Sequence, residues 1–200
     1  QPRIRSEQVT LKRRRFTEEQ IAKAKDMAAN MFTKSFGTVP MAETVCILET
    51  VAKQDVPLLA EVQVIAFSDE LAIVSLPGEI FVELGLALKK ASPFKHTLIA
   101  ELANGSVGYV PNREAYPQGN YEVVSARCES GSGEKLIEVA LKLLGEVKAA
   151  KIVFAGYGIE TPEEATGTDG KKIEAYSSYA HLDVKDKWVL VFRYLPEGIT

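Results

Sequence analysis

Histidine and cysteine, the residues from which most zinc sites and all disulfides are built, are scarce in this sequence of 200 residues. There are two of each, and the two cysteines, Cys46 and Cys128, form neither a Cys-x-x-Cys motif nor a disulfide framework. Cys46 lies in an apolar helical pattern and is predicted to be a small core residue. The cysteines therefore indicate no compartment.

Long apolar runs and a large charge excess are also absent. No stretch reaches the roughly 18 apolar residues that a membrane-spanning helix needs, so no transmembrane segment is predicted. The net charge is −3, and the one basic run, residues 12–15, is short and ends a strand-like segment, so no nucleic-acid partner is predicted. The sequence begins at Gln1 rather than Met, so a missing signal peptide carries no information. The oligomeric state stays open.

What the sequence does contain is an alternation of strand-like and helical segments. The apolar runs 59–67 and 71–76 flank Ser-Asp-Glu and predict a hairpin. An amphipathic pattern after Gly133 predicts a last helix whose apolar face carries Leu136, Ala140, Leu143, Leu144 and Val147. The predicted fold is therefore α/β, with mixed sheets and flanking helices over residues 1–148.

Two further helices are predicted near the start of the chain. Thr17 and Gln20 form a capping box, which marks a helix start. The apolar face of this helix would carry Ile21, Ala24, Ala28, Met31 and Phe32. Pro40 is predicted to open the second helix, with Val45 and Leu48 facing inward.

The composition changes after residue 150. Residues 151–159 are β-like, residues 160–172 are acidic and rich in Gly and Thr, as in an exposed loop, and residues 187–194 read as a strong strand. We place a domain boundary near 148–151 and predict a small β-rich segment after it.

The turn Leu76-Pro77-Gly78-Glu79 is the first candidate site. It follows a strand, and a helix is predicted to begin at Glu79, where the helix dipole favours the ionised carboxylate. That form is the one that binds metal. On these residues alone, a glutamate that caps a helix is the commoner explanation.

The second candidate is the irregular stretch 104–122, which contains Tyr109, Tyr116 and Tyr121. Loops anchored on a rigid strand are where binding groups collect. The alternative is that the tyrosines pack the loop onto the core while their hydroxyls find water or backbone partners.

Taken in order, Leu-Pro-Gly-Glu at 76–79, Leu-x-Asn at 102–104 and the tyrosines of the loop resemble the neutral ceramidases. The resemblance covers residues 1–148 and corresponds to the C-terminal part of the catalytic domain. It implies that Glu79 and Tyr109 are zinc ligands, and that Tyr121 is a catalytic residue that steadies the oxyanion of the amide being cleaved. It also implies an N-acyl or lipid-like substrate such as a sphingolipid, and it favours an extracytoplasmic location.

The sequence departs from this family in two ways. After the glutamate, residues 80–86 replace a Thr-rich helix start and a Gly-Arg-Arg, and neither His96 nor His181 falls at a ligand position. The family's two zinc histidines come from segments upstream of the region that this sequence matches. A catalytic zinc usually has three protein ligands and an open position, and this sequence supplies at most two. We therefore expect a fragment of a zinc-dependent amidohydrolase that is inactive alone.

Residues 151–200 resemble the first half of a protease-associated domain, a module inserted in bacterial zinc aminopeptidases. The residues that carry this resemblance are 153–159, with Gly-Tyr-Gly, and 179–191. Two alternatives to the amidohydrolase follow: an accessory part of a zinc aminopeptidase, and a non-catalytic binding module that retains the fold. Whether the chain itself is an enzyme stays open at this point.

Overall fold

The structure, a computed structural model, divides the chain into two compact units, Gln1–Lys148 and Ala149–Thr200. It describes residues 2–149, 151–154, 165–166, 172–173, 177, 179–182 and 187–190. Among these residues no helix has the length and apolar character to cross a membrane.

In the second unit the structure describes four short strands. Two of them are parallel neighbours, and the other two are antiparallel neighbours: β7 (Lys151–Phe154) with β10 (Lys187–Leu190), and β8 (Ala165–Thr166) with β9 (Lys172–Ile173). Half of the residues behind the protease-associated resemblance, 155–159, 183–186 and 191, lie outside the described ones. The assignment of the two units to a ceramidase-like domain and a partial protease-associated domain therefore stays a prediction.

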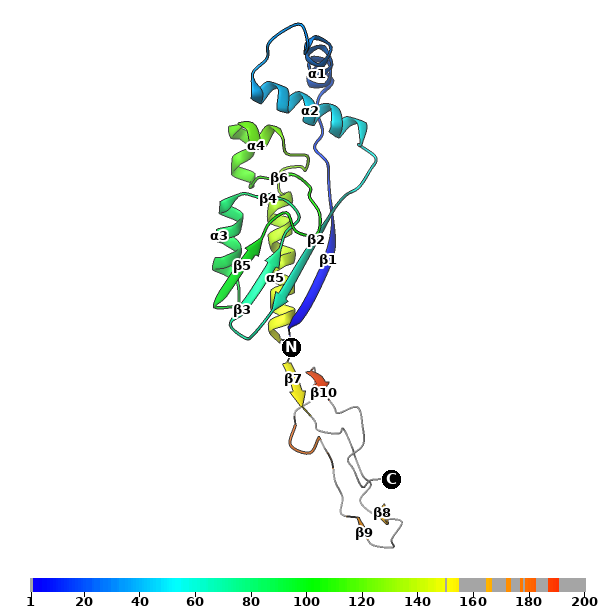
Figure 1. The fold of residues 1–200 in the computed structure, drawn as a ribbon, viewed down its shortest axis with the longest axis vertical. Helices are drawn as coiled ribbons and strands as arrows, with labels where there is room; N and C mark the ends of the chain where they lie inside the picture. The colour runs from blue at the N-terminus through cyan, green and yellow to red at the C-terminus, as the bar shows by residue number, and fades with distance from the viewer. Residues whose placement is uncertain are drawn as a thin grey trace. The chain divides into compact units, whose positions relative to one another are not determined.

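A four-stranded mixed sheet forms the body of the first unit (Figure 1). Its strands, in spatial order, are β1 (Arg3–Leu11), β2 (Leu58–Ala66), β3 (Leu71–Ser75) and β5 (His96–Ala100). The first three are antiparallel neighbours, whereas β3 and β5 are parallel because α3 (Val82–Ala91) lies in the connection between them. The hairpin and the α/β class predicted from the sequence are both confirmed.

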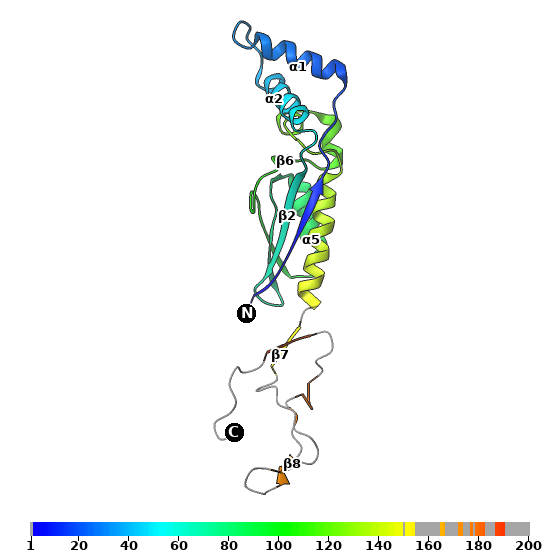
Figure 2. The ribbon, with the colours of Figure 1, turned by 90° about the vertical axis from the view of Figure 1, so that its right-hand side faces the viewer.

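The core lies between one face of this sheet and α5 (Ser132–Ala149), which runs along β1 and β2 (Figure 2). In β2 alternate residues are fully buried: Ala60, Val62, Val64 and Ala66. The apolar face predicted for α5 is buried in the same cluster of side chains. Burial of each of its leucines contributes roughly 1.5–3 kcal/mol, so α5 and the sheet form one rigid base.

The helices α1 (Glu18–Asn30) and α2 (Thr38–Ala52) form a pair beyond the end of the sheet (Figures 1 and 2). The capping box is present, with the Gln20 amide donating to the Thr17 hydroxyl at 3.2 Å and the Thr17 amide donating to the Gln20 side chain at 2.8 Å. Cys46 is buried, as predicted. The predicted inward faces are partly wrong: Phe32 is 91% exposed because the helix ends at Asn30, and Val45 is 58% exposed.

Candidate functional site

Glu79 lies in a two-residue strand and not at the start of a helix. This strand, β4 (Glu79–Ile80), is a parallel neighbour of β6 (Tyr109–Val110), and α3 begins only at Val82. The Glu79 amide donates to the carbonyl of Gly108 at 3.0 Å. The predicted carboxylate at a helix N-terminus is therefore wrong, because strand pairing uses the backbone N–H that a first helical turn would have offered.

The turn before Glu79 fixes where this strand lies. Pro77 and Gly78 are buried, and the Val107 amide donates to the Pro77 carbonyl at 2.7 Å. A Cβ atom at Gly78 would lie 2.7 Å from the carbonyl oxygen of Gly108, so only glycine permits this approach. Two segments that are far apart in the sequence are thereby held side by side.

The register of β4 and β6 places Glu79 directly opposite Tyr109. Paired residues on neighbouring strands project to the same face, so the two side chains meet. Hydrogen bonding to the Glu79 carboxylate raises the pKa of the Tyr109 phenol above its ordinary value, and partial burial and the carboxylate charge add to this effect. The phenol is therefore neutral near pH 7 and available as a hydrogen-bond donor.

Tyr121 also lies next to Tyr109. It is the first residue of α4 (Tyr121–Val124), and its ring meets the Tyr109 ring edge to face, with centroids 6.0 Å apart and an interplanar angle of 77°. This is a favourable arrangement for two aromatic rings. The structure thus brings together the three residues that the sequence singles out, although their roles as ligands and catalyst stay predictions.

Tyr116, the third tyrosine of the loop, has a different environment. It lies in the 3₁₀ helix η1 (Arg113–Gln118), and its hydroxyl donates to the backbone carbonyl of Cys128 at 2.8 Å. Burial raises the pKa of this phenol well above its ordinary value. Tyr116 therefore fits the alternative explanation for the loop tyrosines, which is packing onto the core.

A pocket of about 770 Å³ joins these residues to α2. Glu79, Tyr109 and Tyr121 line its polar side, and Met41, Ala42 and Val45 of α2 line an apolar wall. The exposure of Val45, which the helical pattern failed to predict, follows from this position. The pocket is large enough for a drug-sized ligand, and its lining combines polar side chains with apolar residues of α2.

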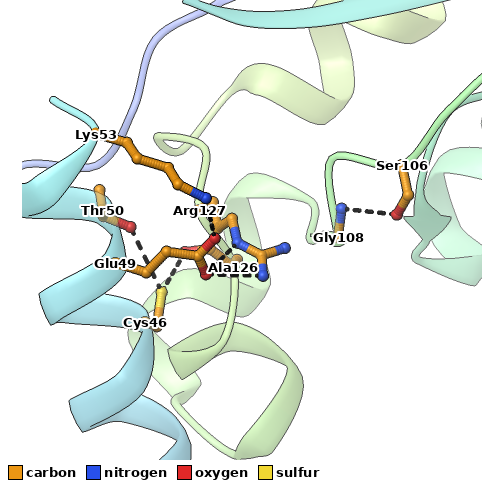
Figure 3. Close-up of polar contacts among 8 residues, drawn as sticks. All are labelled: Cys46, Glu49, Thr50, Lys53, Ser106, Gly108, Ala126 and Arg127. Atoms are coloured by element: carbon orange, nitrogen blue, oxygen red, sulfur yellow. Dashed lines mark hydrogen bonds and ion pairs between the residues drawn. The ribbon is translucent and has the colours of Figure 1, made fainter. Parts of the chain in front are cut away.

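Glu49 and Arg127 also line the pocket, and the sequence pattern predicted neither of them. The Nε atom of Arg127 donates to one carboxylate oxygen of Glu49 at 3.0 Å, and Nη2 forms an ion pair with the same oxygen at 2.9 Å. The Lys53 ammonium donates to the other carboxylate oxygen at 2.8 Å (Figure 3). The hydrogen bond from Lys53 lowers the pKa of Glu49 below its ordinary value, and Arg127 adds a smaller effect in the same direction, although partial burial opposes both. The i,i+4 spacing of Glu49 and Lys53 is readable in the sequence, whereas Arg127 lies 78 positions from Glu49.

Glu79 and Tyr109, the two predicted zinc ligands, lie opposite each other on β4 and β6. Within the part of the chain that the structure describes, no group of three or more His, Cys, Asp or Glu side chains could hold a metal ion. His96 pairs with Leu71, the first residue of β3, whereas Glu79 follows the last residue of that strand. His181 belongs to the second unit. A catalytic zinc usually has three protein ligands, so further ligands would have to come from elsewhere.

No family model and no curated protein matches the chain. Among solved structures, the chain is similar to the neutral ceramidase from Pseudomonas aeruginosa, with 16% sequence identity and a TM-score of 0.49 over 74% of this chain and 28% of that one. It is also similar to a ceramidase complexed with C2, with 19% identity and a TM-score of 0.40 over 43% of this chain and 14% of that one. The chain therefore spans less than a third of either protein. These matches give no support to the protease-associated resemblance. Both of these structures are ceramidases, at identities too low to establish membership of their family.

Proposed function

We propose that this chain carries the carboxylate and tyrosine part of the active site of a zinc-dependent, ceramidase-like amidohydrolase. The observation that supports the proposal is the gathering of Glu79, Tyr109 and Tyr121 around one pocket. The sequence resemblance assigns a role to each of these three residues, and packing of the loop onto the core does not require their side chains to share a pocket. Tyr116 is the contrasting case, a tyrosine of the same loop that packs onto the core and whose hydroxyl donates to the Cys128 carbonyl.

Each side chain has a role in this proposal. Glu79 offers a carboxylate and Tyr109 a phenol oxygen to the same point in the pocket, where they would be two of the metal ligands. Zinc, when bound, would polarise an amide carbonyl and activate water. Tyr121, which is 40% exposed, would donate a hydrogen bond to the oxygen on which negative charge develops.

The pocket also suggests the kind of substrate. Met41, Ala42 and Val45 of α2 line the same pocket as Glu79 and the two tyrosines. A molecule with an apolar chain next to an amide would place its chain on α2 and its amide near Tyr121. We therefore propose an N-acyl, lipid-like substrate, as the resemblance implies.

The chain alone is expected to turn over no N-acyl sphingosine when Zn²⁺ is added, because it supplies only two of the usual three zinc ligands. It is still expected to bind a short-chain N-acyl amide in the pocket. Amide chemical shifts of Val45, Tyr109 and Tyr121 would report that binding, and Val45→Asp would weaken it, while Val56→Asp, on an exposed valine outside the pocket lining, would not. Turnover that disappears in Glu79→Ala would refute the expected inactivity, and binding unaffected by Val45→Asp would refute the proposed substrate site.

A non-catalytic binding module is the second candidate function. The observation in its favour is that the described residues hold no group of three metal-binding side chains. Such a module would bind the same N-acyl ligand through α2 and the tyrosines without responding to Zn²⁺ at Glu79. The response to Zn²⁺ therefore separates the two candidates.

A further inference from the structure

We propose that Arg127, held in place by Glu49, is a positioning residue that sets the location of Glu79 in the pocket. It would act through the backbone of Gly108, which lies between its guanidinium group and the Glu79 amide. The inference rests on the proposed function only in taking Glu79 and Tyr109 to be the residues that need positioning. The contacts themselves are independent of any metal or substrate.

The guanidinium group of Arg127 is fixed from two directions. Its contacts to Glu49 involve two nitrogen atoms, and Lys53 holds the other oxygen of the same carboxylate. The backbone around it is anchored as well, because the Arg127 carbonyl accepts from the Arg14 amide at 2.9 Å. The neighbouring Ala126 is fully buried. Planar contacts of this kind fix the orientation of an arginine as well as its position.

The free end of the guanidinium group packs against the loop that leads into β6. A Cβ atom at Gly108 would lie 2.7 Å from Nη1 of Arg127, so this nitrogen occupies the space beside the glycine (Figure 3). Gly108 has a φ of +83°, which a residue with a side chain rarely adopts. Its amide donates to the Ser106 hydroxyl at 3.2 Å, and its carbonyl accepts from the Glu79 amide at 3.0 Å. Arg127 is therefore one residue away from Glu79 along a series of direct contacts.

The same pair links the two walls of the pocket. Glu49 belongs to α2, which forms the apolar wall, and Arg127 reaches the polar side through Gly108. The buried residues of α1 and α2 do not belong to the main core cluster. Besides the ion pair, the Cys46 thiol of α2 donates to the carbonyl of Ala126, next to Arg127, at 3.4 Å. Both side chains are partly exposed, 35% and 29%, and partly exposed ion pairs contribute little to stability. The pair is thus placed to organise the site rather than to stabilise the fold.

Native-state hydrogen exchange on the full chain, without metal or substrate, tests this inference at the Glu79 amide. In Arg127→Ala and in Glu49→Gln, exchange of this amide is expected to become about tenfold faster or more. Loss of the guanidinium group beside Gly108 would let this residue move, and its carbonyl accepts from the Glu79 amide. The amides of Leu76 and Glu129, which bond to Ala100 and Lys12, are expected to change by less than about twofold. Arg127→Lys keeps the charge but loses the planar contact, so an intermediate acceleration is expected.

Arg113→Ala is the matched control. Arg113 also packs against a glycine of positive φ, since a Cβ atom at Gly131 would lie 2.9 Å from its Nη2, and it pairs with Glu134 away from the pocket. This variant is expected to leave the Glu79 amide unchanged. If Arg127→Ala does not fold, Glu49→Gln and Arg127→Lys provide the same comparison.

Two outcomes would overturn the inference: an unchanged Glu79 amide in the folded variants, or equal acceleration of all amides, which would show a role in stability alone. Because no metal is present, the result does not depend on zinc binding. A selective effect at Glu79 combined with no response of Glu79 to Zn²⁺ would keep Arg127 as an organiser of the pocket and remove the proposed hydrolase site. A response of Glu79 to Zn²⁺ with no selective effect on its amide exchange would keep the proposed hydrolase site and remove the proposed role of Arg127.

Discussion

At the scale of single residues, Glu79 and Tyr109 lie opposite each other on β4 and β6, and the Glu79 carboxylate changes the pKa of the Tyr109 phenol. The carboxylate accepts a hydrogen bond from the neutral phenol and repels the phenolate, and both effects raise the pKa of Tyr109. A metal ion bound between the two oxygens would reverse this relation, because it favours the deprotonated forms of its ligands. The pair is therefore a sensitive reporter of what occupies the site.

Replacing Glu79 with glutamine is expected to lower the pKa of Tyr109 toward its ordinary value of about 10, since the charge that opposes the phenolate is lost. Titration of ¹³Cζ-labelled tyrosine by NMR would measure this, with Tyr109→Phe assigning the signal. Glu122→Gln is the matched control, because Glu122 raises the pKa of Tyr109 only weakly, through its charge. An unchanged pKa in Glu79→Gln, or equal shifts in the two variants, would contradict the contact.

The sequence predicts some of these residues and not others, for physical reasons. Glu79, Tyr109 and Tyr121 stand out because a turn signal and a loop rich in tyrosine depend on local residue types. Arg127 and Glu49 do not stand out, because their contact exists only after α2 and the segment before α5 have folded together. The sequence around a charged residue on a helix or in a loop does not indicate which distant residue it will contact.

At the scale of elements, a helix or strand can be predicted from the sequence when it is long enough to show a repeating apolar pattern. The helix α5 shows an apolar face along its whole length, and every residue predicted for that face is buried. The strands β4 and β6 have two residues each, too few for any alternation to be seen. That is why the sequence predicts a helix at Glu79 where the structure has a strand.

The unequal burial of leucines in α5 and α3 leads to a stability prediction. Leu144 of α5 is 0% exposed and Leu86 of α3 is 60% exposed. Leu144→Ala is expected to lower the free energy of unfolding by about 2–5 kcal/mol, because it removes buried methyl groups and leaves a cavity. Leu86→Ala makes the same change in a helix of the same unit and is expected to cost less than about 1 kcal/mol. Urea denaturation would measure both, and similar losses would place α5 outside the core.

At the scale of the whole molecule, the two units differ in what the described residues offer as a core. The first unit has a four-stranded sheet buried against α5, whereas β7 and β10 form a sheet of two strands. Sheets of two strands are only marginally stable without further packing. The change in composition predicts a boundary near 148–151, but the strands β8 and β9, with two residues each, are too short for a repeating pattern to predict them.

The amides of Val153 and Val189, in β7 and β10, are therefore expected to exchange faster than those of β2 and β3. Hydrogen exchange followed by NMR or mass spectrometry on the intact chain would measure the difference. Equal protection in both units would show one cooperative core and would argue against two separate units.

The central claim is that Glu79 and Tyr109 form part of a metal-binding hydrolase site, and a Zn²⁺ titration of the intact chain followed by amide chemical shifts tests it most directly. The account predicts shifts at the Glu79 and Tyr109 amides that disappear in Glu79→Gln and persist in Glu122→Gln. It predicts weak binding, because two ligands hold zinc less tightly than the usual three or four. Shifts confined to other residues, or shifts at Tyr109 that survive Glu79→Gln, would contradict the account.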